Sequence, residues 1–525
     1  MIRSLAESKI GPADQALPGA DDPELKARVE EILSRHPAVG LAVGVIREGH
    51  LAFFYGHGAA DIASGTPVTQ DTVFRIGSLT KTFTAIAVLQ LWEQGLLDLD
   101  APASDYLRAY RLVPAQATHR PATARDLLTN TGGLPQVVYL SRVFKPTLGE
   151  MTRFGQRVPA LAEFYHGELH LVAEPGAMHI YSNHGFATLG QIVEDVSGEP
   201  LDRYFRGHIF GPLGMEQTDL LRSERVKGRL ATEYALRSHG PRPVRDYDLI
   251  TAGGGGIYST TSDMARYVAA LLGGGERGSV VKAETLAAMF APQYQPDPRL
   301  PGVGLAFYRR DVGGHLIAEK DGLVRGFASQ LFVAPDDGVG VVAFTNGARA
   351  AHGWLGSEVL GIIRHVLGVP GEVIRTAVPH HPEIWGDLCG WYAFPGSLRD
   401  MQKWAVAGVQ VLARRGQLTL RLVTPVPGVH RDFSLHPEDG EDPGLFRIDL
   451  SALGMGTIRV VFSRAPDMGP AALHVELPGM PMSFQKQPAT RDPRRWAQGA
   501  LGALGAATAA AAVRRRRGPG KEVRA

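Results

Sequence analysis

The stretch Phe74-Arg-Ile-Gly-Ser78-Leu-Thr-Lys81-Thr-Phe-Thr-Ala85 places a serine and a lysine three residues apart at the start of a predicted helix. Residues i and i+3 share one face of a helix, so we expect the Lys81 amine to reach the Ser78 hydroxyl. A serine hydroxyl is a weak nucleophile until a neighbouring base removes its proton. Lysine acts as that base when desolvation and nearby cations lower its pKa. The helix N-terminus also offers free backbone N–H groups where an oxyanion would develop.

The Ser-x-x-Lys spacing alone is not specific, because the chain holds a second copy, Ser279-Val-Val-Lys282. Its two middle residues are β-branched and it precedes a predicted helix over Ala283–Phe290, which argues against a shared helical face. We therefore interpret Ser279 as structural and Ser78 as the candidate nucleophile.

Two further segments support this choice. Tyr181-Ser-Asn183 follows Glu174-Pro-Gly176 and is predicted to lie in a loop. A tyrosine beside two lysines is a candidate phenolate that passes a proton to a leaving group, and an asparagine can orient a lysine and a substrate carbonyl. The segment from Glu319 to Phe327 comes just before a predicted strand and contains Lys320-Asp-Gly322. A lysine beside a glycine on a strand edge would put a positive charge and an approachable backbone N–H next to a substrate.

In these residues and in this order the sequence resembles the serine β-lactamase-like superfamily. The matching branch holds class C β-lactamases, family VIII esterases, D-aminopeptidases and DD-peptidases, and the resemblance covers about residues 30–370. It is carried by Ser78-Leu-Thr-Lys81, Tyr181-Ser-Asn183 and Lys320-Asp-Gly322. It is extended by Asp126-Leu-Leu-Thr-Asn-Thr-Gly-Gly-Leu-Pro135, by Phe210-Gly-Pro-Leu-Gly-Met215, and by the segment from Ala252-Gly-Gly to Tyr258-Ser-Thr-Thr-Ser-Asp-Met264.

The resemblance implies a serine that becomes acylated, a lysine base, a tyrosine proton relay and a set of substrate-binding groups. The implied catalytic residues are Ser78, Lys81, Tyr181 and Lys320, and the implied substrate-binding residues are Asn183, Gly322 and Leu323.

The third motif carries two implied functions and one departure. The resemblance implies that Lys320 supports the tyrosinate and any substrate carboxylate, and that the N–H groups of Ser78 and Leu323 form the oxyanion hole. Asp321 stands where a small or hydroxyl residue is common. Asp321 would pair with Lys320 and partly neutralise it, which leaves the recognition of anionic substrates open.

The composition is ordinary for a soluble globular protein, with 44% apolar and 21% charged residues in a chain of 525. These values exclude a wholly disordered or collagen-like chain. Cys389 is the only cysteine, which excludes an intramolecular disulfide framework and an all-cysteine zinc site. The net charge of +2 is unevenly distributed, since residues 491–525 carry +7 and the other 490 residues carry −5. The body therefore has no basic stripe for a nucleic acid.

Both ends of the chain bear on localisation. Met1–Ala16 is interrupted by charged residues and a proline and has no apolar core of the kind that a secretory signal needs, so we expect a cytoplasmic protein. Trp496–Val513 is uncharged and is followed by Arg514–Arg517, which makes a membrane span conceivable. Alanine and glycine dominate that stretch and bring little apolar area, so we favour a peripheral or disordered tail with at most weak contact to a membrane surface.

Apolar alternating runs near both ends of the first 370 residues predict β-hairpins. One hairpin joins Gly40–Ile46 to Leu51–Tyr55, and another joins Ala328–Ala334 to Gly340–Thr345 through Pro335-Asp-Asp-Gly338. These patterns predict an α+β fold, in which an antiparallel sheet of N- and C-terminal strands is flanked by helices and joined by a mostly helical region. Helices are predicted at Pro23–Arg35, Phe83–Trp92, Leu189–Val196, Met264–Leu272 and Glu284–Phe290.

The composition changes around residues 368–385, where Gly368-Val-Pro-Gly371 and Pro379-His-His-Pro382 are typical of a linker. Short alternating segments follow and predict an all-β module, a small lipocalin-like barrel or a sandwich. We therefore predict a hydrolase domain over residues 1–375, an all-β domain over 385–490 and a basic tail over 491–525.

The leading hypothesis is a serine hydrolase that cleaves a small ester or amide through an acyl-enzyme. One alternative is a D-amino-acid peptidase, favoured by Lys320 and by the appended β module, or a β-lactamase-type amide hydrolase. Another is a catalytically silent binding or scaffold protein that keeps the fold. The chain has neither the Gly-x-Ser-x-Gly elbow of α/β-hydrolases nor a His-Glu-x-x-His motif, and no ligand spacing accompanies His380-His381. We expect no metal and no cofactor, and the oligomeric state stays open.

Overall fold

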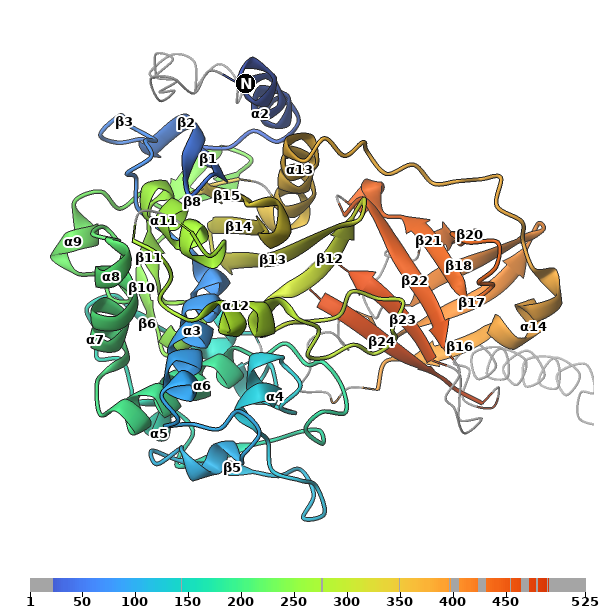
Figure 1. Ribbon diagram of the computed structural model, residues 1–525, viewed down its shortest axis with the longest axis horizontal. Coiled ribbons are helices and arrows are strands. Elements are labelled where there is room, and N and C mark those ends of the chain that lie inside the picture. Colours follow the sequence, from blue (N-terminus) through green and yellow to red (C-terminus); the bar gives the residue numbers. More distant parts are fainter. Residues whose placement is uncertain are drawn as a thin grey trace, which may run out of the picture.

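The computed structural model describes residues 22–142, 144–274, 277–348, 350–395, 397, 406–423, 431–453, 455–463, 472–477, 480–488 and 490. Strands from both ends of the first 350 residues form one antiparallel sheet (Figure 1). Its order is β12-β13-β14-β15-β1-β2-β3, and Leu41 of β1 lies opposite Thr345 of β15. This confirms the predicted α+β fold. The bounds are β1 (Gly40–Arg47), β2 (His50–Asp61), β3 (Thr66–Pro67), β12 (Tyr308–Val312), β13 (His315–Val324), β14 (Phe327–Ala334) and β15 (Val339–Thr345).

The two predicted hairpins are the pairs β1–β2 and β14–β15. The second turns through a short 3₁₀ helix at Pro335–Asp337 and closes at Gly338, whose φ of 65° lies in the left-handed region that glycine adopts without strain. Local turn chemistry therefore accounts for the register of this pair.

Alternate residues of the sheet face two different hydrophobic cores. Leu41, Val43 and Val45 of β1 pack with α2 (Pro23–Arg35) and α13 (Ala351–Val366). Ala42 and Ile46 point to the opposite face, toward α11 (Thr261–Leu271) and α3 (Thr80–Glu93). Because side chains alternate across a strand, one apolar run serves both layers.

A mostly helical region lies between β3 and β12 in sequence and beside the sheet in space, and α3 runs through its centre (Figure 1). Residues Thr80–Leu91 of α3 are all buried, as expected of a helix that is covered on every side. The other helices are α4 (Ala124–Leu128), α5 (Leu161–Phe164), α6 (Asn183–Ser197), α7 (Leu201–Phe205), α8 (Gly211–Leu213), α9 (Glu224–Lys227), α10 (Ala252–Gly255) and α12 (Ala283–Phe290). Short strand pairs join β4 (Phe74–Arg75) to β11 (Tyr258–Ser259), β5 (Arg111–Val113) to β7 (Glu168–His170), β6 (Met151–Arg153) to β10 (Tyr247–Leu249) and β8 (Tyr234–Arg237) to β9 (Gly240–Pro243).

The C-terminal part is a near-closed β-barrel that follows α14 (Trp385–Leu388). Its nine strands run in the order β19-β18-β17-β16-β24-β23-β22-β21-β20, so that the two edge strands are neighbours in sequence, separated only by Leu435. Of the two predicted forms, barrel or sandwich, the barrel is the correct one. Its strands are β16 (Gly390–Ala393), β17 (Gly408–Arg414), β18 (Gln417–Val423), β19 (Asp432–Ser434), β20 (His436–Pro437), β21 (Leu445–Asp449), β22 (Thr457–Ser463), β23 (Ala472–Leu477) and β24 (Met480–Lys486).

The barrel packs against the β12 side of the first unit (Figure 1). Arg299 donates to the Asp442 carboxylate at 3.0 Å and to the Phe462 carbonyl at 2.8 Å. Met178 packs against the apolar core of the barrel. The barrel therefore contacts the chain three residues before Tyr181.

No helix in the described part of the chain combines the length and the apolar character that crossing a membrane requires. The stretches Met1–Ala16 and Trp496–Val513, on which the localisation predictions rest, lie outside the described residues.

Candidate active site

Ser78 lies in a one-turn 3₁₀ helix, Gly77–Leu79, that runs directly into α3. Lys81 is fully buried in the first turn of α3, and its Nζ is hydrogen-bonded to Ser78 Oγ at 3.0 Å. Gly77 has a φ of 53°, and a Cβ there would lie 2.9 Å from the Leu323 nitrogen. The turn before Ser78 thus needs a glycine for its conformation and for the close approach of β13.

The second motif, which spans the end of a loop and the first residue of α6, contacts Ser78 and Lys81. The Tyr181 hydroxyl lies 2.5 Å from Ser78 Oγ. Lys81 Nζ donates to Asn183 Oδ1 at 2.8 Å and to the carbonyl oxygen of Gly254 at 2.6 Å. The loop prediction is correct for Tyr181 but wrong for Asn183, which is the first residue of α6.

Asn130, in the Asp126–Pro135 segment, holds the loop that carries Tyr181. Its Oδ1 accepts from the Ser182 N–H at 3.2 Å and its carbonyl oxygen accepts from the Ile180 N–H at 2.7 Å. Asn130 itself has a φ of 56°, a left-handed conformation that asparagine tolerates better than most residues. Asn130 therefore fixes the backbone on both sides of Tyr181.

The third motif precedes β14, as predicted, but it lies within the second half of strand β13. Pairing with β14 places Lys320 and Gly322 in the ladder despite the low strand propensity of Asp321 and Gly322, whereas the pairing of β13 with β12 ends at Glu319. A Cβ on Gly322 would lie 2.2 Å from the Ile76 carbonyl oxygen and 3.1 Å from the Ser78 nitrogen. The strand backbone thus packs directly on the turn that carries Ser78, with the half-exposed Leu323 beside it.

Lys320 is enclosed rather than open to solvent. Its side chain is 2% exposed, and Nζ lies 3.4 Å from Asp321 Oδ1. Nζ also lies 5.3 Å from the ring centre of Tyr181 and 4.6 Å from that of Tyr308, within the range of cation–π contacts. The ammonium therefore faces Tyr181 and the Asp321 carboxylate predicted to neutralise it.

Burial shifts the pKa values of Lys81 and Tyr181 in opposite directions. The pKa of Lys81 is lowered well below its usual value, first by burial and then by the charge of Lys320. The pKa of Tyr181 is raised, mainly by burial and further by Asp321. The neutral amine and the protonated phenol are therefore favoured, and the phenolate expected from the sequence is disfavoured in the free protein.

The acceptors around Lys81 define where its lone pair points. Amide and carbonyl oxygens only accept hydrogen bonds, so the Asn183 and Gly254 oxygens each take an N–H of Lys81. In the ammonium form the third N–H donates to Ser78 Oγ. In the neutral form the lone pair occupies that position and faces the Ser78 hydroxyl, ready to accept its proton.

A pocket of about 350 Å³ opens beside these groups. Glu150, which the sequence did not indicate, belongs to its wall and accepts from Asn183 Nδ2 at 3.2 Å. No motif marks Glu150 in the sequence, because its importance comes from a contact with a residue 33 positions away. The lining residues are Ser78, Glu150, Asn183, Leu249, Thr251, Gly254, Gly255, Leu323, Val324 and Arg325.

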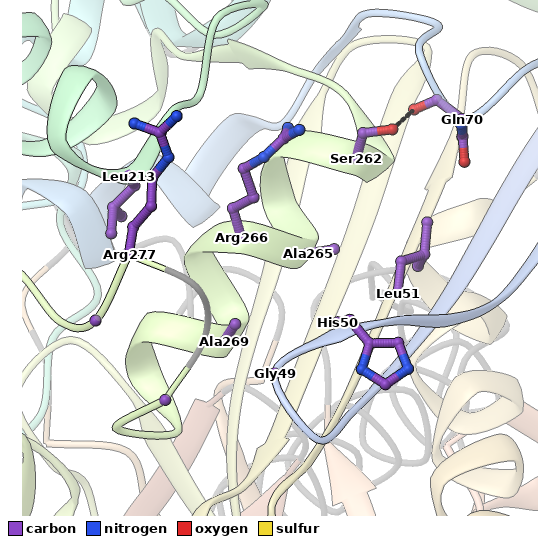
Figure 2. A pocket seen from close by; sticks show the side chains of 12 residues that line it. Gly49, His50, Leu51, Gln70, Leu213, Ser262, Ala265, Arg266, Ala269 and Arg277 are labelled. Atoms are coloured by element: carbon purple, nitrogen blue, oxygen red, sulfur yellow. Dashed lines mark hydrogen bonds between the residues drawn. The ribbon is translucent and has the colours of Figure 1, made fainter.

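A second hollow, shown in Figure 2, lies between α11 and the β1–β2 hairpin. Arg266 on α11 and Arg277 line one side of it, and His50 and Leu51 of the hairpin line the other. It contains no residue of the three motifs, whereas the pocket at Ser78 contains residues from each of the three segments that carry these motifs.

Ser279 lies apart from the motif residues. It is exposed, and its Oγ accepts from the Val281 N–H at 3.4 Å. Within the described residues, no group of three or more His, Cys, Asp or Glu side chains is placed to hold a metal ion.

Residues 25–354 match the family model described as Beta-lactamase. The chain belongs to the Beta-lactamase family. Penicillin-binding protein 4 of Amycolatopsis lactamdurans is 28% identical over 396 residues, which cover 72% of this chain and 98% of that protein. The D-alanyl-D-alanine-carboxypeptidase/endopeptidase AmpH of Escherichia coli (strain K12) is 32% identical over 231 residues, 44% of this chain and 57% of that protein. The solved structure of SurE with D-Leu is 24% identical, with a TM-score of 0.58, and the match covers 90% of this chain and 100% of that one.

This chain is therefore a serine hydrolase of the β-lactamase and esterase family, with an additional C-terminal near-closed β-barrel. The family implies a small ester or amide substrate.

Proposed function

We propose that this protein hydrolyses small esters through an acyl-enzyme on Ser78, with Lys81 as the base and Tyr181 as the proton relay. The observation that carries the proposal is the position of Ser78 Oγ between Lys81 Nζ, at 3.0 Å, and the Tyr181 hydroxyl, at 2.5 Å. A buried amine with a lowered pKa and a buried phenol with a raised pKa suit a base and an acid at one nucleophile.

The reaction follows from these positions. Ser78 Oγ attacks the ester carbonyl carbon while its proton passes to Lys81 Nζ. The carbonyl oxygen becomes an oxyanion that accepts from the N–H groups of Ser78 and Leu323. Tyr181 protonates the departing alkoxide and regains a proton from the neighbouring Lys81 ammonium, which restores the neutral amine. Water then repeats the sequence on the acyl group and releases Ser78.

The enclosure of Lys320 favours neutral substrates over carboxylate-ended peptides. Its ammonium is 2% exposed and already paired with Asp321, so a substrate carboxylate gains little from it. Its charge instead lies near Tyr181, where it stabilises negative charge on the phenol oxygen as the proton leaves.

A D-amino-acid peptidase is the second candidate. The match to the carboxypeptidase/endopeptidase AmpH and the barrel contact through Met178 support it. A silent scaffold is disfavoured, since nucleophile, base and relay are all within hydrogen-bond distance.

The decisive experiment compares Ser78→Ala with Ser279→Ala. We expect Ser78→Ala to abolish labelling by a serine-reactive fluorophosphonate and hydrolysis of p-nitrophenyl butyrate, with the thermal unfolding curve retained. Ser279→Ala should keep both the labelling and the ester hydrolysis. Parallel assays with nitrocefin and D-alanyl amides distinguish the esterase from the alternatives. Equal labelling of the two variants would mean that another serine is the nucleophile.

A further inference from the structure

The buried carboxylate of Glu150 contacts Asn183 on the side away from Lys81, and the reaction above does not use it. Glu150 directly precedes β6, and its side chain is 1% exposed. Its Oε2 accepts from Asn183 Nδ2 at 3.2 Å and from Thr251 Oγ1 at 3.0 Å. Glu150 is therefore one hydrogen-bonded residue away from the base, Lys81.

This contact decides which end of the Asn183 amide faces Lys81. An amide nitrogen only donates and an amide oxygen only accepts, while an ionised carboxylate only accepts. Glu150 therefore holds Nδ2 toward itself, which leaves Oδ1 to accept from Lys81 at 2.8 Å. With the amide reversed, an N–H would point at the amine and compete with Ser78 for its lone pair.

The Glu150 carboxylate has a second buried neighbour, the imidazole of His184. Nε2 of His184, the residue after Asn183, lies 3.3 Å from Glu150 Oε1, and its Nδ1 lies 2.9 Å from the Tyr165 hydroxyl. Burial acts to raise the pKa of Glu150, but the neighbouring His184 and the hydrogen bonds from Thr251 and Asn183 outweigh it, so that the pKa is lowered. A buried carboxylate without such partners would be strongly destabilising.

The charge of Glu150 also acts on the base. The charged groups that bear on Lys81 are Lys320, which disfavours the ammonium, and Glu150 and Asp321, which favour it. The titratable groups that face Glu150 are His184, Tyr165, Tyr181 and Lys81.

We propose that Glu150 is a positioning residue of the active site: held by His184 and Thr251, it orients the Asn183 amide toward Lys81, and its negative charge keeps that lysine basic enough to take the serine proton. This inference rests on the proposed function and adds to it a residue outside the three motifs.

The test is the pH profile of Glu150→Gln. Loss of the negative charge disfavours the Lys81 ammonium, so the acid limb of kcat/KM for p-nitrophenyl butyrate should move to lower pH. The glutamine amide can also donate, so Asn183 loses its single orientation. We expect kcat/KM on the pH plateau to fall by roughly tenfold, a part of the 10²–10⁴ that a positioned base contributes. The rate of fluorophosphonate labelling against pH should show the same shift.

Three controls separate positioning from folding. Glu150→Asp and Thr251→Val keep the charge, so both should keep the wild-type acid limb even where the rate falls. Asp219→Asn removes another buried carboxylate, one that is paired with Arg206, and should lower the unfolding temperature without moving the limb. The inference about Glu150 would be wrong if the acid limb did not move in Glu150→Gln, or if it moved equally in Asp219→Asn. Either result would leave the proposed function standing. Failure of the wild-type chain to label would overturn the proposed function.

Discussion

At the scale of single residues, Lys81 shows how burial lowers the pKa of an amine. Its amine is fully buried on α3 and is surrounded by acceptors, with the cation of Lys320 in the same site. Water would keep a lysine protonated at neutral pH, whereas this surrounding favours the neutral base. A lysine three residues after a serine becomes catalytic only when the fold excludes solvent from it.

Replacement of Lys81 by alanine tests this role. We expect Lys81→Ala to lower kcat/KM by about 10²–10⁴, the usual contribution of a general base. In the wild-type protein activity should be lost as pH falls through the lowered pKa of Lys81, because the protonated amine no longer accepts the serine proton. The measurement is kcat/KM against pH. Lys282→Ala, in the second Ser-x-x-Lys copy, is the matched control and should leave the profile unchanged.

At the scale of elements, the contact between β13 and the turn before α3 assembles the site. Gly322 allows the strand backbone to lie against Ile76 and Ser78, since a Cβ would lie 2.2 Å from the Ile76 carbonyl oxygen and 2.3 Å from Ser329 Oγ. Neither neighbour can move easily, because Ser329 Oγ itself donates to that carbonyl oxygen at 2.7 Å.

Gly322→Ala should therefore push β13 away from the nucleophile. We expect the free energy of unfolding to fall by about 1–3 kcal/mol, as in overpacked cores, together with a loss of ester hydrolysis. Thermal unfolding and kcat/KM measure the two effects. Gly361→Ala, on α13 where an added Cβ meets no atom within 4 Å, should be neutral or stabilising. Full activity in Gly322→Ala would contradict this account of the strand.

At the scale of the whole molecule, the barrel contacts the segment before Tyr181 through Met178 and the 297–299 loop through Arg299. Truncation near residue 380 leaves the seven-stranded sheet and all three motifs intact. We expect residues 1–380 to fold, to keep or gain activity on small esters, and to change their preference among larger ones. Circular dichroism and a series of p-nitrophenyl esters of increasing chain length check this. An insoluble, inactive fragment would show that the barrel belongs to the catalytic core.

The junction between the two parts also carries a pH-dependent charge. Glu476 of β23 lines a small cavity with Arg310 and Glu319 of β12 and β13, and burial raises its pKa to about 7 against the effect of Arg310. A folded-state pKa above the unfolded value means that stability is lost as pH rises from about 4.5 to about 7.

Glu476→Gln should remove the loss of stability that the ionisation of Glu476 causes as pH rises. We expect the variant to match the wild-type protein below pH 4.5 and to be more stable at pH 8, on the order of 1–2 kcal/mol. Thermal unfolding at several pH values measures the difference. Glu441→Gln, on the exposed surface of the barrel, should show no gain that grows with pH. A constant difference across the pH range would rule out the titration of Glu476 as its cause.

The sequence by itself determined the two hairpins, α3 and the identity of Ser78, Lys81, Tyr181 and Asn183 as candidates. The alternation of apolar residues, the turn residues and the three-residue spacing of Ser78 and Lys81 involve only neighbours along the chain, so they can be recognised in the sequence alone. Only the tertiary structure decided that Lys320 lies inside a strand and is enclosed by Asp321 and two tyrosine rings. It also decided that burial raises the pKa of Tyr181 and that Glu150 accepts a hydrogen bond from Asn183. Those properties depend on burial and on tertiary contacts such as those of Glu150 with Asn183, 33 positions away, and of Ser78 with Tyr181, 103 positions away, and no periodicity along the chain encodes them.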